Sequence, residues 1–517
     1  MLLKDMLGRS VKFYPDKTAI AFEGSRHTYQ EFNKRVNRLA NALINLGVKE
    51  GDRVPVLQDN CHQYIELYFA IPKIGAVIVP LNYRLGTREL LHILNDIEPE
   101  VMFVGKDFLN VTDSIKPELK KSIRKYICIE GPHEGMESYE NLLGDSSETE
   151  VDCKVSEDDV AFQIYTSGTT GKPKGAMLTH RNVVSNTITA TLERKRFEPD
   201  IYLGVVPVFH VAVENILQML YVGGTVILLK QFDPKTVLEM IERKKVTYVT
   251  LVPAMINFLL DYPDIDKYDL SSLSLLFYGA SPMPVDRLKK AMAVFKCDFM
   301  QTFGQTEASP MISILRPDDH IPDGSEEEVK RLASCGRRAF NVEVKIVDED
   351  DNKVAAGEVG EILAKGHNVM KGYWNMPEET AKTLRNGWLH TGDMGRMDDE
   401  GYIYIVDRKK DMIISGGENI YPKEIEEVLY THPSILEAAV IGVPDEKWGE
   451  AVKAVVVLKE GEKVTEDEII EFCKKNLAGY KKPKSVNFID TLPRTPSGKV
   501  LKPELREKYW KRYGRKV

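Results

Sequence analysis

Gln163-Ile-Tyr-Thr-Ser-Gly-Thr-Thr-Gly-Lys-Pro-Lys-Gly175 is the stretch that says most about how this chain folds. The residues before it, Val160–Tyr165, are apolar and β-prone, which predicts a strand entering a loop. The loop combines four aliphatic hydroxyls, three glycines and two lysines. Glycines let backbone N–H groups come close to a ligand, while hydroxyls and lysines add donors and positive charge. The stretch therefore predicts a polyphosphate-binding loop.

This loop differs from the usual P-loop. Gly171-Lys172 is followed by Pro173 instead of serine or threonine, and position 166 is threonine where that motif has glycine. The alternative is a flexible linker rich in glycine, serine and threonine. Linkers seldom carry Lys-Pro-Lys behind a buried strand, so we favour a phosphate-binding loop of another class.

The composition fits a globular protein with more than one domain. The chain has 517 residues, which exceeds the natural size of one core, and 43% of them are hydrophobic and 29% charged. A net charge of −8 argues against a general nucleic-acid binder. Lys4 and Asp5 interrupt any secretory signal, and charges and proline break the most apolar region, 64–81. We expect neither a signal peptide nor a transmembrane span.

Cysteine and histidine usage gives no sign of a disulfide framework or a zinc site. The six cysteines are scattered without a Cys-x-x-Cys pair, and the ten histidines lack metal-ligand spacing. This pattern predicts free thiols in a reducing cytoplasm.

Strand and helix patterns alternate over most of the chain. A hairpin around Gly24 precedes a helix over 29–46, and strands at 54–57, 77–80 and 101–104 alternate with helices. The rhythm returns after the loop, with strands expected at 202–206, 225–229, 246–252, 274–278 and 297–301. This alternation is typical of mostly parallel sheets covered by helices, and we expect an α/β fold with two stacked sheets.

The pattern changes in the last third of the chain. Short strands at 342–347 and 359–364 predict a small β-barrel-like subdomain. After Asp407, helices near 422–430 and 465–477 and strands near 412–414, 436–443 and 451–458 predict a smaller α+β domain. We place the domain break after residue 409, which gives domains of 1–409 and 410–517.

The run Thr166–Gly175 resembles, over its whole length, the signature loop of the adenylate-forming (AMP-binding) superfamily. This superfamily includes acyl-CoA synthetases, peptide-synthetase adenylation domains and firefly luciferase. A carboxylate is a poor acylating agent because its leaving group would be oxide. When the carboxylate attacks the α-phosphate of ATP, AMP becomes the leaving group, and a thiol can then take the acyl group. The resemblance implies ATP phosphate binding by Thr166, Ser167, Gly168, Thr169, Thr170, Gly171 and Lys174.

A second motif, Gln301-Thr-Phe-Gly-Gln-Thr-Glu307, resembles the superfamily's aromatic-Gly-x-Thr-Glu pattern. The resemblance implies that Glu307 coordinates Mg²⁺, that Thr306 contacts phosphate, and that Phe303 and Gly304 lie against adenine. A carboxylate suits Mg²⁺, which prefers hard oxygen ligands. Relatives usually have tyrosine at the position of Phe303, so its phenolic hydrogen bond is missing here.

Two further motifs resemble the remaining nucleotide contacts. Tyr278-Gly-Ala-Ser281 is similar to the adenine-side loop, formed by Gly279, Ala280 and Ser281, although strand-end turns often have this composition. Gly387–Asp393 is similar to the ribose motif, in which Asp393 accepts hydrogen bonds from the ribose hydroxyls. Arg408, after Asp407, matches the next ribose contact; the alternative for this charged stretch is a solvated surface.

The C-terminal part carries two specific matches. Ile413–Pro422 resembles the loop in which Gly416 and Gly417 line the thiol tunnel. Pro493-Arg-Thr-Pro-Ser-Gly-Lys499 resembles the motif of the catalytic lysine, so Lys499 is expected to neutralise charge at the α-phosphate. The superfamily rotates this domain about a hinge between its two half-reactions. Alignment places the hinge at Lys410, where many relatives have aspartate.

Phe209-His210 matches the place where the acyl pocket meets the nucleotide, and a catalytic role for His210 follows from the resemblance. Peptide-synthetase domains have aspartate at this position to hold an amino group. A site without that carboxylate and with apolar neighbours favours an uncharged, apolar acyl group. A merely structural His210 is the alternative, and Glu214 is an unexplained exception among the apolar residues.

These resemblances cover about residues 10 to 505 and imply a CoA ligase for a fatty, alicyclic or aromatic acid, with ATP, Mg²⁺ and coenzyme A as cofactors. The alternatives are an adenylation enzyme that loads a carrier protein, a luciferase-like oxygenase and a non-catalytic ATP-binding module. A sensor would need neither Glu307 nor Lys499. The sequence leaves chain length, ring preference and oligomeric state open, a homodimer included.

The basic tail Arg506–Lys516 has three interpretations. It can be a solvated helix face, which we favour, or contact a CoA phosphate or an anionic membrane surface peripherally.

Overall fold

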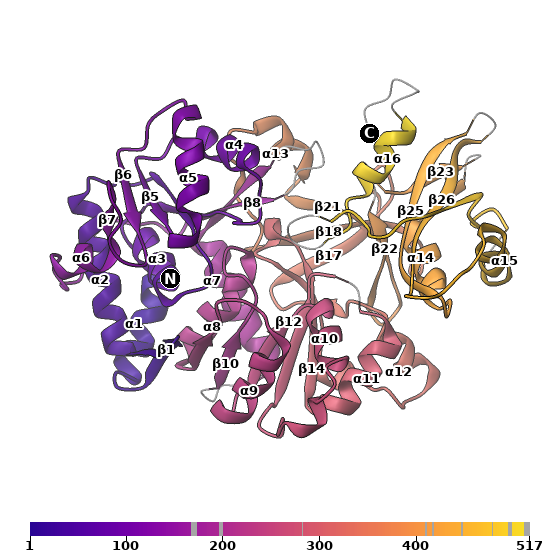
Figure 1. Ribbon diagram of the computed structural model, residues 1–517, viewed down its shortest axis with the longest axis horizontal. Helices are drawn as coiled ribbons and strands as arrows, with labels where there is room; N and C mark the ends of the chain where they lie inside the picture. Colours follow the sequence, from indigo (N-terminus) through magenta and orange to yellow (C-terminus); the bar gives the residue numbers. More distant parts are fainter. Residues whose placement is uncertain are drawn as a thin grey trace. The chain divides into compact units, whose positions relative to one another are not determined.

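The computed structural model describes residues 1–166, 173–195, 200–281, 283–408, 411–415, 418–445, 448–477, 479–494 and 499–510. The chain packs as two compact units (Figure 1). The first comprises Met1–Val344, Leu363–His390 and Gly401–Ile403, and the second comprises Lys345–Ile362, Thr391–Glu400 and Tyr404–Val517. The second unit takes in stretches ahead of residue 409, and the domain break predicted there stays a prediction.

A nine-stranded sheet in the first unit carries the segments predicted to hold the acyl group, the adenine side and the metal. Its inner strands pair in parallel, and antiparallel pairs close its two edges. Its order is β16-β15-β14-β13-β12-β10-β11-β1-β2. The strands are β1 Thr18–Phe22, β2 Ser25–Thr28, β10 Ile201–Gly204, β11 Thr225–Leu228, β12 Tyr248–Leu251, β13 Leu275–Gly279, β14 Asp298–Gly304, β15 Met311–Leu315 and β16 Arg337–Arg338.

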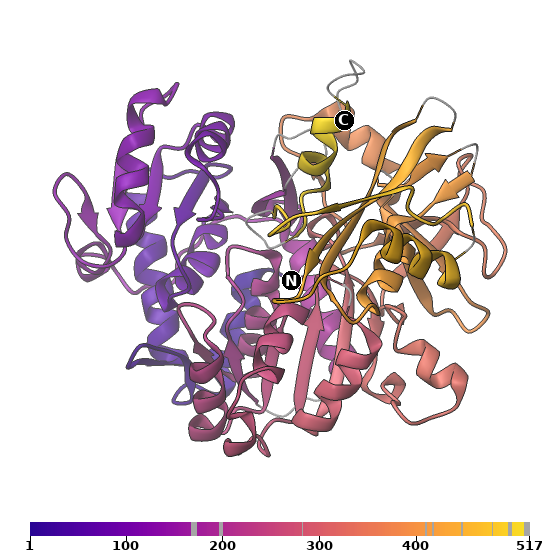
Figure 2. The same cartoon turned by 45° about the vertical axis from the view of Figure 1, so that its right-hand side comes forward.

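Helices cover both faces of this sheet because its side chains alternate between two cores. Leu203 and Leu276 pack in one core with α9, α10 and α11, which lie together on one face in both views (Figures 1 and 2). Their neighbours Tyr202 and Leu275 belong to a second core with α1, α7 and α8, as the period of two requires. These helices are α1 Leu3–Phe13, α7 His180–Arg194, α8 Glu214–Val222, α9 Pro234–Lys244, α10 Pro253–Leu260 and α11 Val285–Phe295.

An eight-stranded sheet in the same unit has the order β19-β9-β8-β4-β3-β5-β6-β7. Its strands are β3 Arg53–Leu57, β4 Val77–Pro80, β5 Val101–Val104, β6 Lys125–Cys128, β7 Glu137–Ser138, β8 Val160–Thr166, β9 Lys174–Thr179 and β19 Gly372–Tyr373. Phe162 of this sheet and Met300 of the other share one core, and α4 and α5 cover the opposite face. The predicted pair of stacked α/β sheets is confirmed. The further helices of the unit are α2 Tyr29–Asn45, α3 His62–Lys73, α4 Thr87–Ile97, α5 Leu109–Ile115, α6 Tyr139–Gly144, α12 Glu326–Arg331 and α13 Pro377–Thr383.

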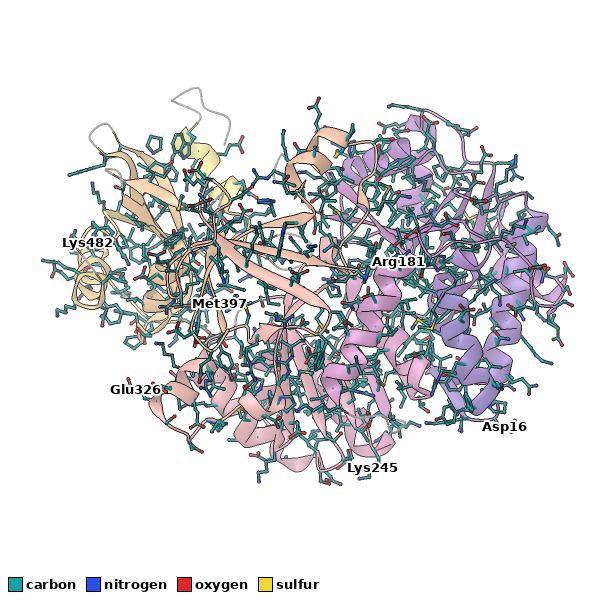
Figure 3. The ribbon with its side chains drawn as sticks, turned by 180° about the vertical axis from the view of Figure 1, so that it is seen from behind. Asp16, Arg181, Lys245, Glu326, Met397 and Lys482 are labelled. Carbon is teal, nitrogen blue, oxygen red and sulfur yellow. The ribbon has the colours of Figure 1, made fainter. Side chains whose placement is uncertain are left out.

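Capping residues fix where the helices near the site begin. The α7 helix starts after Thr179, whose side-chain oxygen accepts from the Asn182 N–H at 3.2 Å while the Asn182 side chain accepts from the Thr179 N–H at 2.8 Å. This reciprocal pair satisfies two donors at the helix start. Arg181, labelled in Figure 3, adds ion pairs to Glu157 and Asp158 at 2.8 and 2.9 Å. The first turn of α7 is thereby fixed.

Two smaller sheets complete the fold. The first is a curled half-barrel with the order β17-β18-β21-β20, and β22 pairs with β21, in agreement with the predicted β-barrel-like subdomain. The second, β24-β23-β26-β25 with β27 beside β26, lies in the second unit with α14, α15 and α16. Their bounds are β17 Val342–Val347, β18 Gly360–Gly366, β20 Leu384–Arg385, β21 Trp388–Met397, β22 Ile403–Arg408, β23 Ile413–Ser415, β24 Glu418–Ile420, β25 Ile435–Asp445, β26 Gly449–Leu458, β27 Ser485–Phe488, α14 Pro422–Tyr430, α15 Glu466–Asn476 and α16 Lys502–Trp510.

The described part of the tail has an exposed and a buried face, and Glu507 and Lys508 are exposed as the favoured prediction of a solvated helix face requires. Arg506 and Trp510 of α16 are buried: Arg506 pairs with Asp411 at 3.0 Å, and Trp510 donates to the Gly442 carbonyl at 3.1 Å. One face of α16 thus packs within the second unit, and residues 511–517 lie outside the described part of the chain. No helix among the described residues is long and apolar enough to cross a membrane.

Candidate active site

The predicted phosphate loop joins two antiparallel strands of the eight-stranded sheet. β8 and β9 pair from Val160↔Thr179 to Thr166↔Lys174, so both ends of the loop are fixed in register. Of the positions predicted to bind phosphate, Thr166 at the end of β8 and Lys174 at the start of β9 are described. Ser167, Gly168, Thr169, Thr170 and Gly171 lie outside the described residues. The strand–loop–strand connection confirms that this is not a P-loop, in which a helix follows the glycines.

Lys174, at the end of this loop, is nearly buried and balanced by a carboxylate. Its Nζ lies 2.6 Å from Glu379 Oε2, and it sits 5.3 Å from the centre of the Tyr373 ring. The hydrogen bond from Lys174 lowers the pKa of Glu379, aided by Lys382. The predicted phosphate contact of Lys174 therefore competes with an existing ion pair.

Glu307 follows the end of β14 and has one oxygen fixed. The Tyr373 hydroxyl donates to Glu307 Oε1 at 2.8 Å, and the Met370 N–H donates to the Glu307 carbonyl at 2.8 Å. Burial, followed by the charge of Glu307, raises the pKa of Tyr373, so the phenol stays a hydrogen-bond donor. Oε2 makes no hydrogen bond with any described residue. A buried, oriented carboxylate with one available oxygen fits a Mg²⁺ ligand.

The predicted adenine-side residues lie side by side at the ends of two neighbouring strands. Gly279 of β13 pairs with Thr302 of β14 in parallel register. A Cβ on Gly279 would come within 2.7 Å of the Thr302 carbonyl oxygen, so only glycine fits. Ala280 has a φ of 68°, which turns the chain sharply before the exposed Ser281. Phe303 follows on β14 and packs against the main core.

Gly304 is held against the segment that carries Glu307. A Cβ there would lie 1.6 Å from the Pro310 carbonyl oxygen, and the Gln305 N–H donates to the same oxygen at 3.0 Å. Thr306 opens a short 3₁₀ turn over Thr306–Ala308. The backbone of this turn is thus fixed by contacts that require glycine at position 304.

The predicted acyl segment follows the end of β10, in the same sheet. Asn60 accepts from the Val208 N–H at 2.8 Å, and the Tyr68 hydroxyl donates to the Val208 carbonyl at 2.7 Å. Phe209 is buried, with its ring centre 5.0 Å from that of Tyr83 and 4.3 Å from that of the half-buried His210. A 3₁₀ turn over Val211–Val213 leads into α8.

These segments meet at one edge of the sheet. β10, β12, β13 and β14 run parallel, so the residues after β10, β13 and β14 all follow carboxyl ends of strands at the same end of the sheet, with β12 between β10 and β13. In α/β sheets this edge is where ligands bind. The structure therefore brings together the predicted acyl, adenine-side and metal residues of the first unit.

The remaining predicted residues belong to the second unit. Asp393 on β21 is 3% exposed, and its N–H donates to Thr391 Oγ1 at 3.1 Å. Lys499 is exposed and stands next to the bridge between Arg494 and Val500. Arg408 ends β22. Lys410, Gly416 and Gly417 lie outside the described residues, and the roles of all six stay predictions.

Sequence patterns missed the residues that hold the site together. Tyr373 and Glu379 come from a segment about which no motif was recognised. Asn368 donates to the carbonyls of Ala308 and Met311 at 2.7 Å each, and Asn186 accepts from the Met311 N–H at 3.1 Å. Their partners lie far away in the chain, so spacing carries no signal of them.

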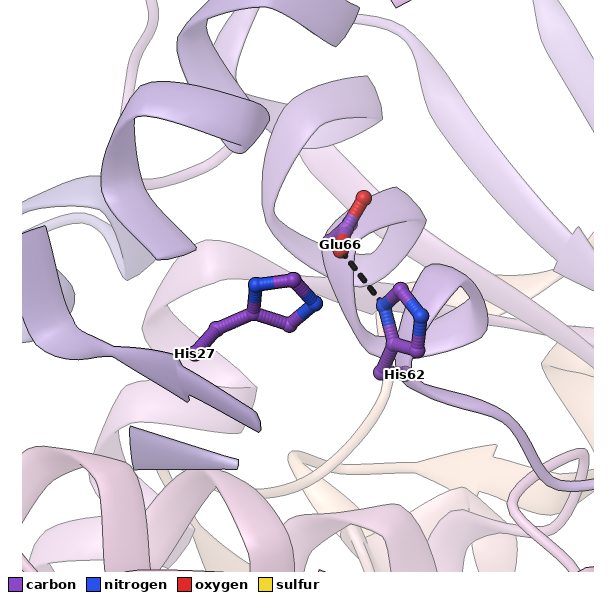
Figure 4. Close-up of side chains that lie close together, drawn as sticks. All are labelled: His27, His62 and Glu66. Carbon is purple, nitrogen blue, oxygen red and sulfur yellow. Dashed lines mark hydrogen bonds and ion pairs between the residues drawn. The ribbon is translucent and has the colours of Figure 1, made fainter. Parts of the chain in front are cut away.

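A second polar cluster, with His27, His62 and Glu66, lies away from these motifs, on β2 and α3 (Figure 4). Potential ligand atoms of the three side chains lie within 4.8 Å of one another. Glu66 Oε1 is already engaged by His62 Nδ1 and by Arg35 Nε, each at 2.8 Å, and Oε2 accepts from the Tyr139 hydroxyl at 2.6 Å. The guanidinium on the same oxygen opposes a cation, so we assign the cluster to stability.

We expect Glu66→Gln to destabilise the protein by about 3 kcal/mol at pH 7. Burial disfavours the charge of Glu66, but the hydrogen bond from His62 and the charge of Arg35 outweigh it and lower the pKa to about 2. The lowered pKa stabilises the fold above the ordinary value of 4.5, and this contribution is lost as the pH falls towards about 2.

Urea unfolding of wild type and variant at pH 7 and pH 4 measures this effect. The difference should be smaller at pH 4, and Glu134→Gln, at an exposed glutamate, should cost little at either pH. An equal difference at both pH values would show that Glu66 does not act through its charge.

Two family descriptions match the chain in order. AMP-binding enzyme matches residues 7–374, and AMP-binding enzyme C-terminal domain matches residues 424–499. The chain is 40% identical over 507 residues to feruloyl-CoA synthase from an Amycolatopsis species, covering 97% of this chain and 98% of the relative. It is 35% identical over 519 residues to a fatty acid–[acyl-carrier-protein] ligase of Streptomyces coeruleorubidus, covering 97% and 95%.

A solved structure with a bound intermediate is also similar. The o-succinylbenzoate CoA synthetase of Bacillus subtilis, in complex with its acyl-adenylate, is 32% identical, with a TM-score of 0.84 and coverage of 97% of each chain. The similarity thus spans both units.

Proposed function

The chain belongs to the AMP-binding enzyme family, and on that premise we propose that it joins an apolar carboxylic acid to coenzyme A at the expense of ATP. It is an acid–thiol ligase. The carboxylate oxygen attacks the α-phosphorus of ATP and pyrophosphate leaves. The CoA thiolate then attacks the acyl carbon of the adenylate, and AMP leaves as the thioester forms.

Three segments at one sheet edge carry this proposal. The Phe209-His210 segment, the Gly279–Ser281 turn and the Glu307 loop follow β10, β13 and β14 of the nine-stranded sheet. An acyl group and a nucleotide held by these segments lie next to each other, as in-line attack by the carboxylate requires. Glu307 would hold Mg²⁺, which screens the phosphate charge during that attack.

The second unit supplies the remaining roles in this proposal. Lys499 neutralises charge at the α-phosphate in the first half-reaction, and Asp393 and Arg408 hold the ribose. The Gly416-Gly417 loop lines the thiol path in the second half-reaction. Lys410 is the hinge that lets Lys499 and the Gly416-Gly417 loop act in turn, because a hinge absorbs a change in φ and ψ at a few backbone positions.

The acyl group is aliphatic, alicyclic or aromatic and carries no amino group. Buried and half-buried apolar residues surround the predicted segment, among them Val211, Val213 and Leu217. His210 stands where an amino-acid-activating site would need a carboxylate. The names of the two sequence relatives, one for an aromatic and one for a fatty substrate, support both substrate classes.

A panel of acids tests the substrate class. Medium-chain fatty acids, cyclohexane carboxylate and cinnamate-type acids should support ATP–pyrophosphate exchange at least ~10²-fold better in kcat/KM than leucine or phenylalanine, because a charged ammonium group is costly to bury. Exchange that is fastest with an amino acid would contradict the apolar site.

Loading of a carrier protein is the second candidate, favoured by the fatty acid–[acyl-carrier-protein] ligase relative. Adding either free CoA or a phosphopantetheinylated carrier protein to the preformed adenylate separates the two. We expect the thioester with free CoA. Turnover with the carrier protein alone would select the alternative.

We place the enzyme in the cytoplasm, where ATP and CoA are available and thiols stay reduced. All six cysteines are thiols in the structure, which supports this placement.

A homodimer and a peripheral contact of the tail with anionic membranes are further proposals. Light scattering tests the first, and sedimentation with anionic vesicles tests the second.

A further inference from the structure

Glu214, the first residue of α8, is an ionisable group buried among apolar side chains. It is 4% exposed, and its neighbours Val213, Ile216 and Leu217 all belong to the main core. Asn186 of α7 donates a hydrogen bond from Nδ2 to Glu214 Oε2. Oε1 has no hydrogen-bond partner among the described residues. Glu214 therefore has one partner in the described part of the chain.

Asn186 also contacts the segment that follows Glu307. Its Oδ1 accepts from the Met311 N–H at 3.1 Å, so each end of the amide has a fixed partner. Met311 lies four residues after Glu307, at the start of β15. Asn368 fixes the same segment from another direction through the carbonyls of Ala308 and Met311. The backbone that carries Glu307 is thus anchored by two amides.

At its other end, the contact reaches the acyl segment. Glu214 follows directly on the turn Val211–Val213, and the Val213 N–H donates to the His210 carbonyl at 3.1 Å. The chain of contacts from His210 through Glu214 and Asn186 to Met311 connects two of the three segments at the sheet edge. A change at Glu214 would therefore alter both the acyl segment and the Glu307 loop.

We propose that Glu214 is a positioning residue that, through Asn186, holds the Glu307 loop in the geometry that binds magnesium–ATP and ties it to the acyl segment. This inference rests on the proposed function and names a residue outside the motifs that define it. Partners that orient a metal ligand typically affect metal affinity or activity by about 10- to 100-fold.

The carboxyl group acts in its neutral form. Burial raises the pKa of Glu214 well above its ordinary value, and the hydrogen bond from Asn186 opposes this only in part. Tyr68 of α3 is a titratable neighbour, and burial raises its pKa well above the ordinary value, so it too is neutral. A neutral acid still accepts from the amide and avoids the cost of a buried charge.

Three variants separate positioning from packing. Glu214→Gln keeps the accepting carbonyl and the shape, so its kcat and its dependence on Mg²⁺ should match those of wild type within a small factor. Glu214→Leu removes the acceptor and leaves the Asn186 Nδ2 donor without its carboxyl partner, while Oδ1 keeps the Met311 N–H. Asn186→Leu removes the amide that links Glu214 to the Met311 N–H. The two leucine variants should need about 10-fold more Mg²⁺ for half-maximal pyrophosphate exchange, with a smaller change in KM for the acid.

The test compares Mg²⁺ titrations of pyrophosphate exchange for these variants, after thermal unfolding has confirmed that each is folded. An unchanged Mg²⁺ requirement in folded Glu214→Leu would overturn the proposal. So would a Glu214→Gln variant that is as impaired as Glu214→Leu, because the charge itself would then be needed.

A measurement independent of activity covers the case in which the proposed function fails. In wild type, a raised pKa means that the unfolded chain ionises above about pH 4.5 while the folded protein does not, so ionisation costs stability as the pH rises. Glu214→Gln removes this cost. Its Tm should exceed that of wild type at pH 8, and the gain should disappear near pH 4.5; a gain that does not vary with pH would contradict a neutral Glu214.

Discussion

Replacing Lys499 by alanine should slow acyl-adenylate formation by about 10²-fold or more and leave acyl transfer from supplied adenylate to CoA largely intact. The reason is charge: a preorganised cation at the α-phosphate stabilises negative charge that grows only in the first half-reaction. In the second half-reaction pyrophosphate has left, and the Gly416-Gly417 loop is predicted to line the path of the thiol. The two half-reactions therefore differ in their need for Lys499.

The structure makes this variant a clean test. Lys499 is exposed, and its segment is held by the bridge between Arg494 and Val500 and by the hydrogen bond from the Leu501 N–H to the Pro493 carbonyl at 2.8 Å. Backbone contacts survive the substitution, so the fold should too. Lys475→Ala, at an exposed lysine of α15, is the matched control. Equal slowing of both half-reactions would contradict a role confined to adenylation.

Glu307→Gln should lower the rate of adenylate formation by about 10²-fold or more at moderate Mg²⁺, because Mg²⁺ supplies several kcal/mol of charge stabilisation. The substitution keeps the shape and the acceptor for the Tyr373 hydroxyl but removes the charge that the metal needs. Pyrophosphate exchange at increasing Mg²⁺ measures the effect, with Glu134→Gln as the matched control.

A protein that unfolds would give the same loss for another reason, so thermal unfolding accompanies the assay. Glu307→Gln should have a Tm close to that of wild type, since its hydrogen bond to Tyr373 is kept. A variant that is folded and fully active at every Mg²⁺ concentration would show that Glu307 is not the ligand.

The sequence was sufficient for the fold class because local patterns agree with the tertiary structure. The strand expected at 274–278 is β13 at Leu275–Gly279, and the helix expected over 29–46 is α2 at Tyr29–Asn45. In α2, Thr28 and Glu31 form a capping box at the start of a run of buried apolar residues. Such signals lie within one helix or strand, so they can be recognised in the sequence without knowledge of the tertiary structure.

Contacts between distant residues could not be predicted in this way. Tyr373 and Glu307 are 66 residues apart, Lys174 and Glu379 are 205 apart, and Asn186 and Met311 are 125 apart. Each contact depends on strand register and helix placement that only the folded chain establishes. Glu214 shows the same limit: it is an exception in the apolar pattern, and its partner on α7 explains it.

The fate of a carboxylate oxygen of the substrate acid tests most directly whether the reaction passes through an acyl-adenylate. The preferred acid of the panel, labelled with oxygen-18 in both carboxylate oxygens, is incubated with the wild-type enzyme, ATP, Mg²⁺ and CoA, and the products are analysed by mass spectrometry. If the carboxylate attacks the α-phosphorus and the thiol then displaces AMP, one labelled oxygen appears in AMP and the other stays in the acyl-CoA. Label in inorganic phosphate, or AMP without label, would contradict an acyl-adenylate intermediate.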